Sequence, residues 1–414
     1  MPVRMTLFAE LVREREWTLL ETFNLHYTRT ANELADTTGN PRLRGMAVPR
    51  RTFDRWMTGR LTGLPQRDTR LVLQTLLGAP AERLFETTDD ADGPLHTLYG
   101  DAAPSISPGA RGRVNPGLAP HWTGLLGVLA AADNTTGPQL VHTTITGELV
   151  VIRDYRARAS GPARDALLGV ESRWAEFAGW TADNLGDGNG ARWLGHAFDL
   201  AREARDRPME AYVLMRQAQR AAEQHQAQAA IDLATAALAA DGASDRDRAL
   251  SAVRLAHGHA LAGDAAASAA LLEKARRLVE RADATDTGDP AVIGHHCVLA
   301  YISAYEAYCQ LLLDRPDRAV AILQPLLTGW PAAYRQDEHL ARAWLAQALL
   351  AHGEPAEAAV HAAAVLTRTA SGGSARILNT LTALEQRMPA GRSAPGEVVH
   401  FRSALGLAHD RMGP

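Results

Sequence analysis

Apolar residues recur at helical spacing through the first 88 positions of the chain. Two stripes of residues three or four positions apart predict two helices. These stripes are Leu7, Phe8, Leu11 and Val12, and then Leu19, Leu20, Phe23 and Tyr27. Thr18 and Glu21 form a capping-box pattern that starts the second helix, and Gly39-Asn40-Pro41 ends it. Three shorter helices bounded by Pro or Gly are predicted over Pro49–Met57, Asp68–Leu77 and Ala81–Phe85.

The pattern changes twice before position 160. From residue 89 to residue 120 the periodicity disappears and Pro, Gly, Ser and Ala dominate, which is typical of a linker. In residues 121–160, Trp122, Leu125 and Leu129 have helical spacing, whereas Val141–Tyr155 has many β-branched residues and fits a strand or a helix. Because helical sequence surrounds this region, we interpret it as a helical connector.

Residues 161–414 repeat a pair of alanine-rich helices. The turns inside successive pairs are about 38 to 40 residues apart, except for one longer interval that contains the insertion Ala284–Pro290. The predicted turns are Leu185-Gly186-Asp187, Glu223-Gln224-His225, Ala262-Gly263-Asp264, Leu313-Asp314-Arg315 and His352-Gly353-Glu354. One pair cannot bury its apolar face alone, so the pairs are expected to stack into a helical-hairpin solenoid. The predicted fold class is therefore all-α.

A basic segment lies within the first region. Residues 42–70 contain eight arginines and two acidic residues. In the helix predicted there, Phe53 and Trp56 share one face and Arg51 and Arg55 share another. Such a helix suits the major groove of DNA, because packing fixes its angle while guanidinium groups reach phosphates or guanine edges. Candidate DNA-binding residues are Arg50, Arg51, Arg55, Arg60 and Arg67. The alternative is a solvated face on a protein-binding domain.

A resemblance to a known family follows from two segments. Phe177–Pro208, FAGWTADNLGDGNGARWLGHAFDLAREARDRP, resembles a tetratricopeptide repeat, although later units exceed the family's period of about 34 residues. Together with the segment WMTGR, the whole chain resembles the helix-turn-helix (XRE-like) plus tetratricopeptide-repeat transcriptional regulators of actinobacteria. These are similar in architecture to the peptide-sensing quorum regulators of Gram-positive bacteria.

The resemblance implies different functions for the first and last regions of the chain. Residues 1–88 would be a helix-turn-helix domain that binds double-stranded DNA as a homodimer, since one recognition helix rarely gives enough specificity. In the family, Thr52 falls on the exposed part of the recognition helix, which adds it to the candidate contacts. Residues 161–414 would be a tetratricopeptide-like domain that mediates dimerisation or senses a peptide or small molecule. The regulated processes would be development or secondary metabolism.

A stacked array of this kind offers a concave groove lined by the first helix of each pair. The polar and aromatic residues expected there are Asn184, Tyr212, Arg216, Arg254, His257, Tyr301, Tyr305 and Arg342. An Asn or Arg in such a groove can hold a peptide backbone or a carboxylate. The alternative for each is ordinary packing between repeats.

Composition narrows the remaining possibilities. The net charge of −4 argues against a surface that coats nucleic acid or anionic membrane throughout. The sequence has no leader pattern, no apolar run of about 20 residues and only two cysteines, so we expect a cytoplasmic protein without membrane contact. The sequence lacks common catalytic motifs. The adjacent residues His295-His296-Cys297 would point in different directions on a helix, which argues against a shared metal ion. We expect no enzyme activity, metal or cofactor. The alternative to a DNA-binding regulator is an adaptor that captures a partner protein in the groove.

Overall fold

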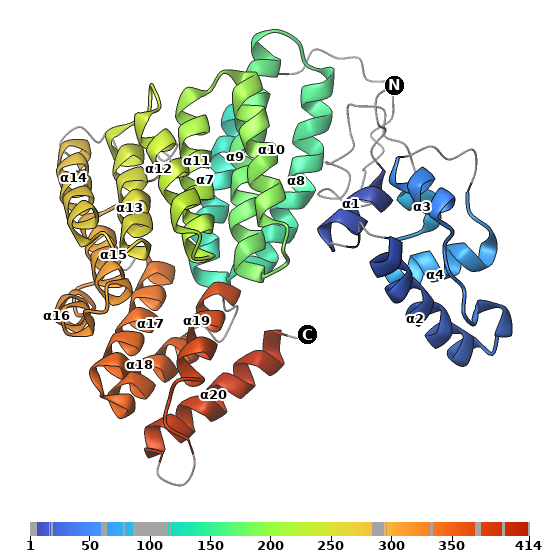
Figure 1. Cartoon of the computed structure of the whole chain (residues 1–414). Helices are drawn as coiled ribbons and strands as arrows, with labels where there is room; N and C mark the ends of the chain where they lie inside the picture. The colour runs from blue at the N-terminus through green and yellow to red at the C-terminus, as the bar shows by residue number, and fades with distance from the viewer. Residues whose placement is uncertain are drawn as a thin grey trace. The chain divides into compact units, whose positions relative to one another are not determined.

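The computed structural model describes residues 6–15, 17, 20–58, 64–77, 79–85, 115, 117–283, 294, 296–331, 334–368, 374–390 and 394–412 of the chain. All regular elements in these residues are helices, so the all-α fold class is confirmed (Figure 1). The chain divides into two units, Met1–Asp101 and Ala102–Pro414, and each is described by itself. Most of the predicted linker, 89–120, lies outside the described residues.

Unit 1 is a small bundle of short helices. They are α1 (Leu7–Glu14), α2 (Leu20–Thr38), the 3-10 turn η1 (Pro41–Leu43), α3 (Arg50–Met57), α4 (Arg67–Leu77) and α5 (Ala81–Leu84). Phe8 lies at the centre of the core, with its ring centroid 5.6 Å from that of Phe23, 5.3 Å from that of Trp56 and 5.2 Å from that of Phe85. The predicted capping residue Thr18 falls outside the described residues.

The connection between α2 and α3 is held along α2 by polar side chains one helical turn apart. The Asn24 side chain both donates to and accepts from the backbone of Val48, at 2.9 and 2.7 Å. Thr28 donates to the carbonyl of Met46 at 2.9 Å. Farther along α2, Asn32 accepts from the amide of Gly45 at 2.8 Å. These contacts satisfy backbone groups that no helix pairs, and they fix the point at which α3 begins.

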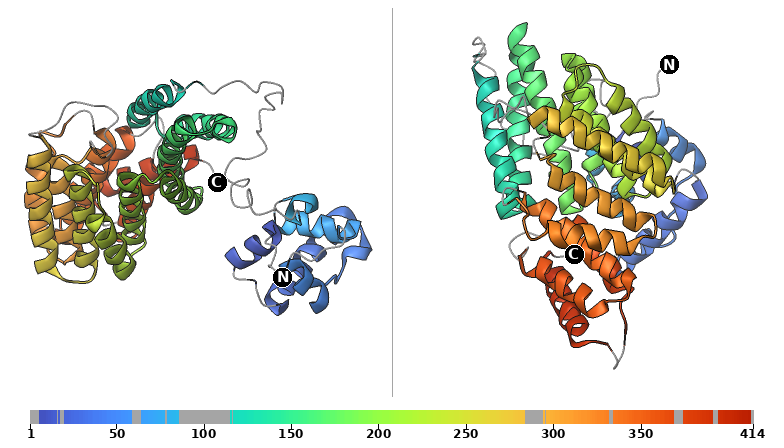
Figure 2. Two further views of the ribbon diagram at one scale, coloured as in Figure 1. Left: turned by 90° about the horizontal axis from the view of Figure 1, so that it is seen from above. Right: turned by 90° about the vertical axis from the view of Figure 1, so that its left-hand side faces the viewer.

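Unit 2 begins with two helices and continues as consecutive pairs. The first two are α7 (Leu118–Thr136) and α8 (Pro138–Arg158), so the segment that fitted either strand or helix is helical. The pairs are α9 (Pro162–Leu185) with α10 (Gly190–Ala204), α11 (Arg207–Glu223) with α12 (Ala227–Ala239), α13 (Asp245–Leu261) with α14 (Ala265–Asp283), α15 (Leu299–Leu312) with α16 (Pro316–Leu326), α17 (Arg335–His352) with α18 (Pro355–Arg368), and α19 (Ala375–Glu385) with α20 (Gly396–Met412). Figure 2 shows them following one another in chain order from green to red.

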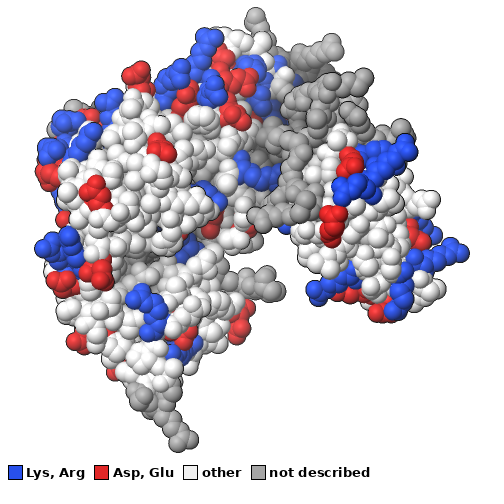
Figure 3. Space-filling view, viewed as in Figure 1, with Lys and Arg blue, Asp and Glu red and all other residues white. Residues whose placement is uncertain are grey.

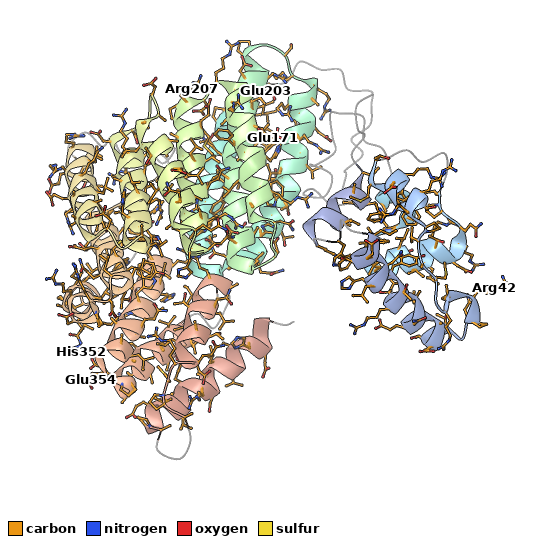
Figure 4. The ribbon with its side chains drawn as sticks, in the orientation of Figure 1. Arg42, Glu171, Glu203, Arg207, His352 and Glu354 are labelled. Atoms are coloured by element: carbon orange, nitrogen blue, oxygen red, sulfur yellow. The ribbon has the colours of Figure 1, made fainter. Side chains whose placement is uncertain are left out.

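Each predicted turn lies between the two helices of a pair, from α9–α10 to α17–α18. One residue of each turn has positive φ, which reverses the chain after the first helix. Those residues are Gly186, His225, Gly263, Asp314 and Gly353. Figure 4 labels His352 and Glu354 on either side of the last of them. Small residues at the interfaces, such as Ala234 and Ala260, are buried and permit close packing of neighbouring helices.

The row of pairs closes on itself. The first helices contact each other in succession from α9 to α19, and α19 also contacts α9. Ser374 donates to the side-chain oxygen of Asn184 at 2.6 Å, across 190 positions of sequence. Arg376 of α19 pairs with Glu223 at the end of α11. Within the described residues, α9 and α19 are therefore in contact instead of lying at opposite ends of an open row. No described helix has both the length and the apolar character needed to cross a membrane.

Candidate functional site

The first candidate surface is the exposed side of α3 in unit 1. Phe53 and Trp56 are 3% and 4% exposed and pack into the aromatic core. Arg51 and Arg55 are exposed on the other side of the same helix, and neither has an ion-pair or hydrogen-bond partner among the described residues. The helix thus separates an apolar face that anchors it from a cationic face in solvent, as the sequence pattern predicted.

Two further candidate contacts lie on α3 itself. Arg50 is exposed and pairs with Glu21 of α2 at 3.0 Å. Both side chains are more than half exposed, so this ion pair is worth about 0–1 kcal/mol and leaves Arg50 free to change partner. Thr52 is half-buried, which limits its reach compared with the arginines.

The remaining candidates flank the helix. Arg67 is the first residue of α4 and is exposed, whereas Arg60 lies outside the described residues. Arg42 at η1 projects from the edge of unit 1 in Figure 4. Figure 3 shows basic side chains at the outer edges of this unit with a few acidic ones beside them. The exposed basic surface is therefore wider than α3 alone.

The second candidate site is a cavity of about 210 Å³ inside unit 2. One face of α7 forms part of its wall, and the rest comes from α9, α11, the start of α15, the start of α17 and α19. Of the predicted groove residues, Tyr212, Arg216 and Tyr301 line it. Other lining residues include Asp133, Glu176, Trp180, Gln336, Asp337 and Arg376.

Hydrogen bonds hold α7 in place as part of this wall. Gln336 of α17 donates to the backbone carbonyl and the carboxylate of Asp133, at 2.9 and 3.0 Å. Trp180 of α9 donates to the same carboxylate oxygen at 3.0 Å. The Trp174 ring donates to the backbone carbonyl of Trp122 at 3.2 Å. Because α7 is tied to both α9 and α17, it covers one side of the interior.

Arg173, Arg216 and Arg376 all line the cavity, and two of them, Arg216 and Arg376, are paired with glutamates. Arg216 donates to Glu176 at 2.7 Å and also contacts Gln219. Arg376 pairs with Glu223 and donates to the Tyr305 hydroxyl at 3.3 Å. The guanidinium groups of Arg216 and Arg376 also lie 4.5 and 5.7 Å from the centroid of the Trp180 ring. Their charges are therefore neutralised within the protein.

Two cavity carboxylates are less well satisfied. Asp133 is 4% exposed, and its second oxygen has no hydrogen-bond partner among the described residues. Burial raises the pKa of Asp133, against the hydrogen bonds from Trp180 and Gln336. Asp337 has no hydrogen-bond partner among those residues either, and burial raises its pKa to about 6. By contrast, burial of the fully buried Glu171 is outweighed by hydrogen bonds from His196 and Arg156, which lower its pKa (Figure 4).

Three predicted groove residues lie behind the cavity wall. Arg254 is 1% exposed, and its guanidinium lies 4.4 Å from the Tyr305 ring centroid and contacts the Tyr301 hydroxyl. His257 is buried beside Tyr305, and burial lowers its pKa to about 3, so it is neutral at pH 7. Arg254, His257 and Tyr305 are therefore buried against other side chains in this structure and do not line the cavity.

Two others are used in local contacts. Asn184 is 2% exposed and its side-chain oxygen is bonded to Ser374 where the row closes. Arg342 pairs with Glu338 one turn earlier on α17, at 2.8 Å. The cavity residues that the sequence prediction missed are chiefly Asp133 and Asp337. They resemble ordinary helix-end residues, since Asp133 is in the last turn of α7 and Asp337 is in the first turn of α17.

No family model matches the chain, and no curated protein or solved structure matches it either. Among the described residues, no group of three His, Cys, Asp or Glu side chains is arranged to hold a metal ion.

Proposed function

We propose that the chain is a DNA-binding transcriptional regulator in which α3 enters the major groove. The observation that carries this proposal is the division of α3 into a buried face, with Phe53 and Trp56, and an exposed face, with Arg51 and Arg55. A recognition helix needs both properties, because it must be held rigidly by its domain while its charged side chains reach bases and phosphates.

The wider basic surface supports the same proposal. Arg50 and Arg67 lie at the starts of α3 and α4, where they can contact phosphates on either side of the groove. The surface pair between Arg50 and Glu21 is weak, so a phosphate can replace the glutamate at small cost. One feature departs from the usual motif: the connection from α2 to α3 spans residues 39–49, longer than the turn of about 3–4 residues in most helix-turn-helix domains.

The role that we propose for unit 2 is to sense a signal, to mediate dimerisation, or both. The cavity between α7 and the closed row supports a sensing role, since it combines aromatic walls with charged groups that converge on one space. This arrangement suits a small molecule better than an extended peptide, because the cavity volume is only about 210 Å³. As the resemblance implies, the regulated processes would be development or secondary metabolism.

Binding of the full-length protein to a labelled generic DNA duplex at two salt concentrations tests the DNA-binding role. If Arg50, Arg51, Arg55 and Arg67 each neutralise one phosphate, affinity should fall roughly a hundredfold between 50 and 200 mM salt. A protein that does not bind the duplex even at low salt would instead be the adaptor, with no DNA-reading function. Binding that is insensitive to salt would also contradict contacts made by these arginines.

A further inference from the structure

We propose that Asp54, on the exposed face of α3, selects the DNA sequence by accepting a hydrogen bond from the amino group of a cytosine in the major groove. This inference rests on the DNA-binding role proposed above and names one base of the site that α3 would read. Arg51 and Arg55 can bind phosphates or guanine, whereas a carboxylate between them is repelled by phosphates. A favourable role for Asp54 in a complex with DNA is therefore a contact with a base.

Asp54 lies among the side chains that point away from the core of unit 1. Successive residues of a helix are about 100° apart, and the middle of the buried face of α3 falls between Phe53 and Trp56. Viewed down the helix axis, Arg51 points almost directly away from that face, with Asp54 about 60° to one side and Arg55 about 40° to the other. All three are exposed. A base pair facing α3 therefore meets the carboxylate as directly as it meets the two guanidinium groups.

The Asp54 carboxylate has no hydrogen-bond or ion-pair partner within the described residues. Arg50 is four positions earlier and has the spacing for an ion pair along the helix. Its guanidinium donates instead to Glu21 of α2, at 3.0 Å. Because the Asp54 side chain is exposed, a base can reach it without any rearrangement of the fold.

The choice of base follows from the donors in the major groove. An ionised carboxylate only accepts hydrogen bonds, and the groove presents base donors at N4 of cytosine and N6 of adenine. Adenine places the acceptor N7 beside its amino group, a pair that an amide matches and a carboxylate does not. Guanine and thymine present acceptors, which repel the Asp54 carboxylate. Cytosine is therefore the favoured partner of Asp54.

The neighbouring arginines indicate where in the site the cytosine should lie. Asp54 is three residues after Arg51 and one residue before Arg55, which separates it from them by about 4.5 Å and about 1.5 Å along the helix axis. One base-pair step of the DNA duplex is about 3.4 Å. Arginine reads guanine through O6 and N7. We therefore expect the cytosine within about two base pairs of a guanine that Arg51 or Arg55 contacts.

Selection of binding sites from a pool of random DNA duplexes, with the full-length protein, tests the proposal. The unaltered protein should enrich a motif in which cytosine is preferred about tenfold at one position. Asp54→Ala should lose this preference and bind the unselected pool at least as tightly, because it also removes a charge that phosphates repel. Asp54→Asn should shift the preference from cytosine to adenine, since an amide pairs with N6 and N7 of adenine.

Two further variants serve as controls in the same selection. Glu33→Gln removes one negative charge from an exposed side chain of α2 and should select the same motif as the unaltered protein. Arg51→Ala should lose a guanine from the motif while the cytosine is retained. Circular dichroism of each variant should show unchanged helical content, because all these side chains are exposed.

The outcomes separate this inference from the function on which it rests. A motif that Asp54→Ala and Asp54→Asn leave unchanged, or no enriched motif at all, would overturn the inference while the DNA-binding proposal stands. Loss of a guanine instead of the cytosine in Asp54→Ala would also overturn it, because Asp54 would then only orient an arginine. A protein that retains no duplex from the pool would overturn both.

Discussion

Asn24 and Val48 exchange a pair of hydrogen bonds, side-chain amide to backbone carbonyl at 2.9 Å and backbone amide to side-chain carbonyl at 2.7 Å. The Asn24 side chain thereby pairs both backbone polar groups of Val48, as a neighbouring strand would in a β-sheet. Val48 lies two residues before α3 and is itself 4% exposed, so the pair fixes both the direction and the depth at which α3 starts. The position of the arginine face thus depends on one residue of α2.

Replacing Asn24 by Ala should loosen α3. The change leaves the backbone groups of Val48 without partners in a partly buried position, at a cost of about 1–3 kcal/mol. Amide hydrogen exchange in α3 should then accelerate by roughly 5- to 160-fold if it proceeds through local opening. Leu25→Ala, at a neighbouring residue that is 69% exposed, should leave exchange almost unchanged. Equal effects of the two substitutions would show that the bond pair is not what holds α3.

The arginine face can be tested by removing Arg51 and Arg55 together. We expect the Arg51→Ala, Arg55→Ala variant to lose most of its protection of genomic DNA sites, and its salt dependence should become shallower by about two phosphate contacts. Helical content should remain unchanged, because both residues are exposed. Mapping of protected sites, with circular dichroism on the same samples, measures both outcomes.

A second double variant, which also removes two arginines, serves as the control for the loss of charge. Arg29 and Arg277 are exposed, and each pairs with a glutamate on its own helix. Arg29→Ala with Arg277→Ala should keep the footprints of the unaltered protein. Footprints that persist in the Arg51, Arg55 variant would count against α3 as the reading helix.

Much of the local structure could be predicted from the sequence. Prolines and glycines mark the helix ends of unit 1, as at Gly39 and Pro49, because they limit the backbone locally. The turns of unit 2 could be located for the same reason. His225 and Asp314, however, adopt positive φ without being glycine, which the composition of the turns did not show.

The closure of unit 2 could not be predicted in this way. The bond between Asn184 and Ser374 joins residues 190 positions apart, and the curvature that brings them together accumulates from small rotations between pairs. Without that closure, Asp133 and Asp337 look like separate helix-end acids, whereas Arg254 and His257 look like lining residues. The candidate cavity is a property of the closed arrangement, so only part of its lining was predictable.

The turns permit a test of backbone conformation alone. Gly263 has φ of +80°, and a β-carbon there would meet no atom within 4 Å. Gly263→Ala should therefore destabilise unit 2 through strain only, by about 1–2 kcal/mol. Gly195, within α10, also has free space around it, so Gly195→Ala should stabilise by about 0.5–1 kcal/mol. Urea unfolding followed by circular dichroism should give opposite signs for the two variants, and a common sign would contradict the assigned conformations.

Asp337 predicts a dependence of stability on pH. Its pKa is raised from 3.8 to about 6 in the folded state, so its ionised form costs stability at neutral pH, and that cost disappears as pH falls below 6. Asp337→Asn, which carries no charge at any pH, should be more stable than the unaltered protein at pH 7.5 by about 1–3 kcal/mol. The difference should shrink through pH 6 and vanish near pH 4.

Thermal melting at several pH values measures this difference. Asp317→Asn, in the first turn of the neighbouring helix α16, provides a control with the same loss of helix-end charge. If the stability gained by Asp337→Asn does not vary with pH, burial does not raise the pKa of the Asp337 carboxyl.

The contact between α19 and α9 also has a consequence for how unit 2 unfolds. An open row of repeats has two ends that can fray independently. Here a hydrogen bond between Ser374 and Asn184 joins the last pair to the first, so neither end is expected to unfold by itself. Unit 2 is therefore expected to melt in one step. The rate at which a bound molecule exchanges would be limited by how often the contact between α9 and α19 opens.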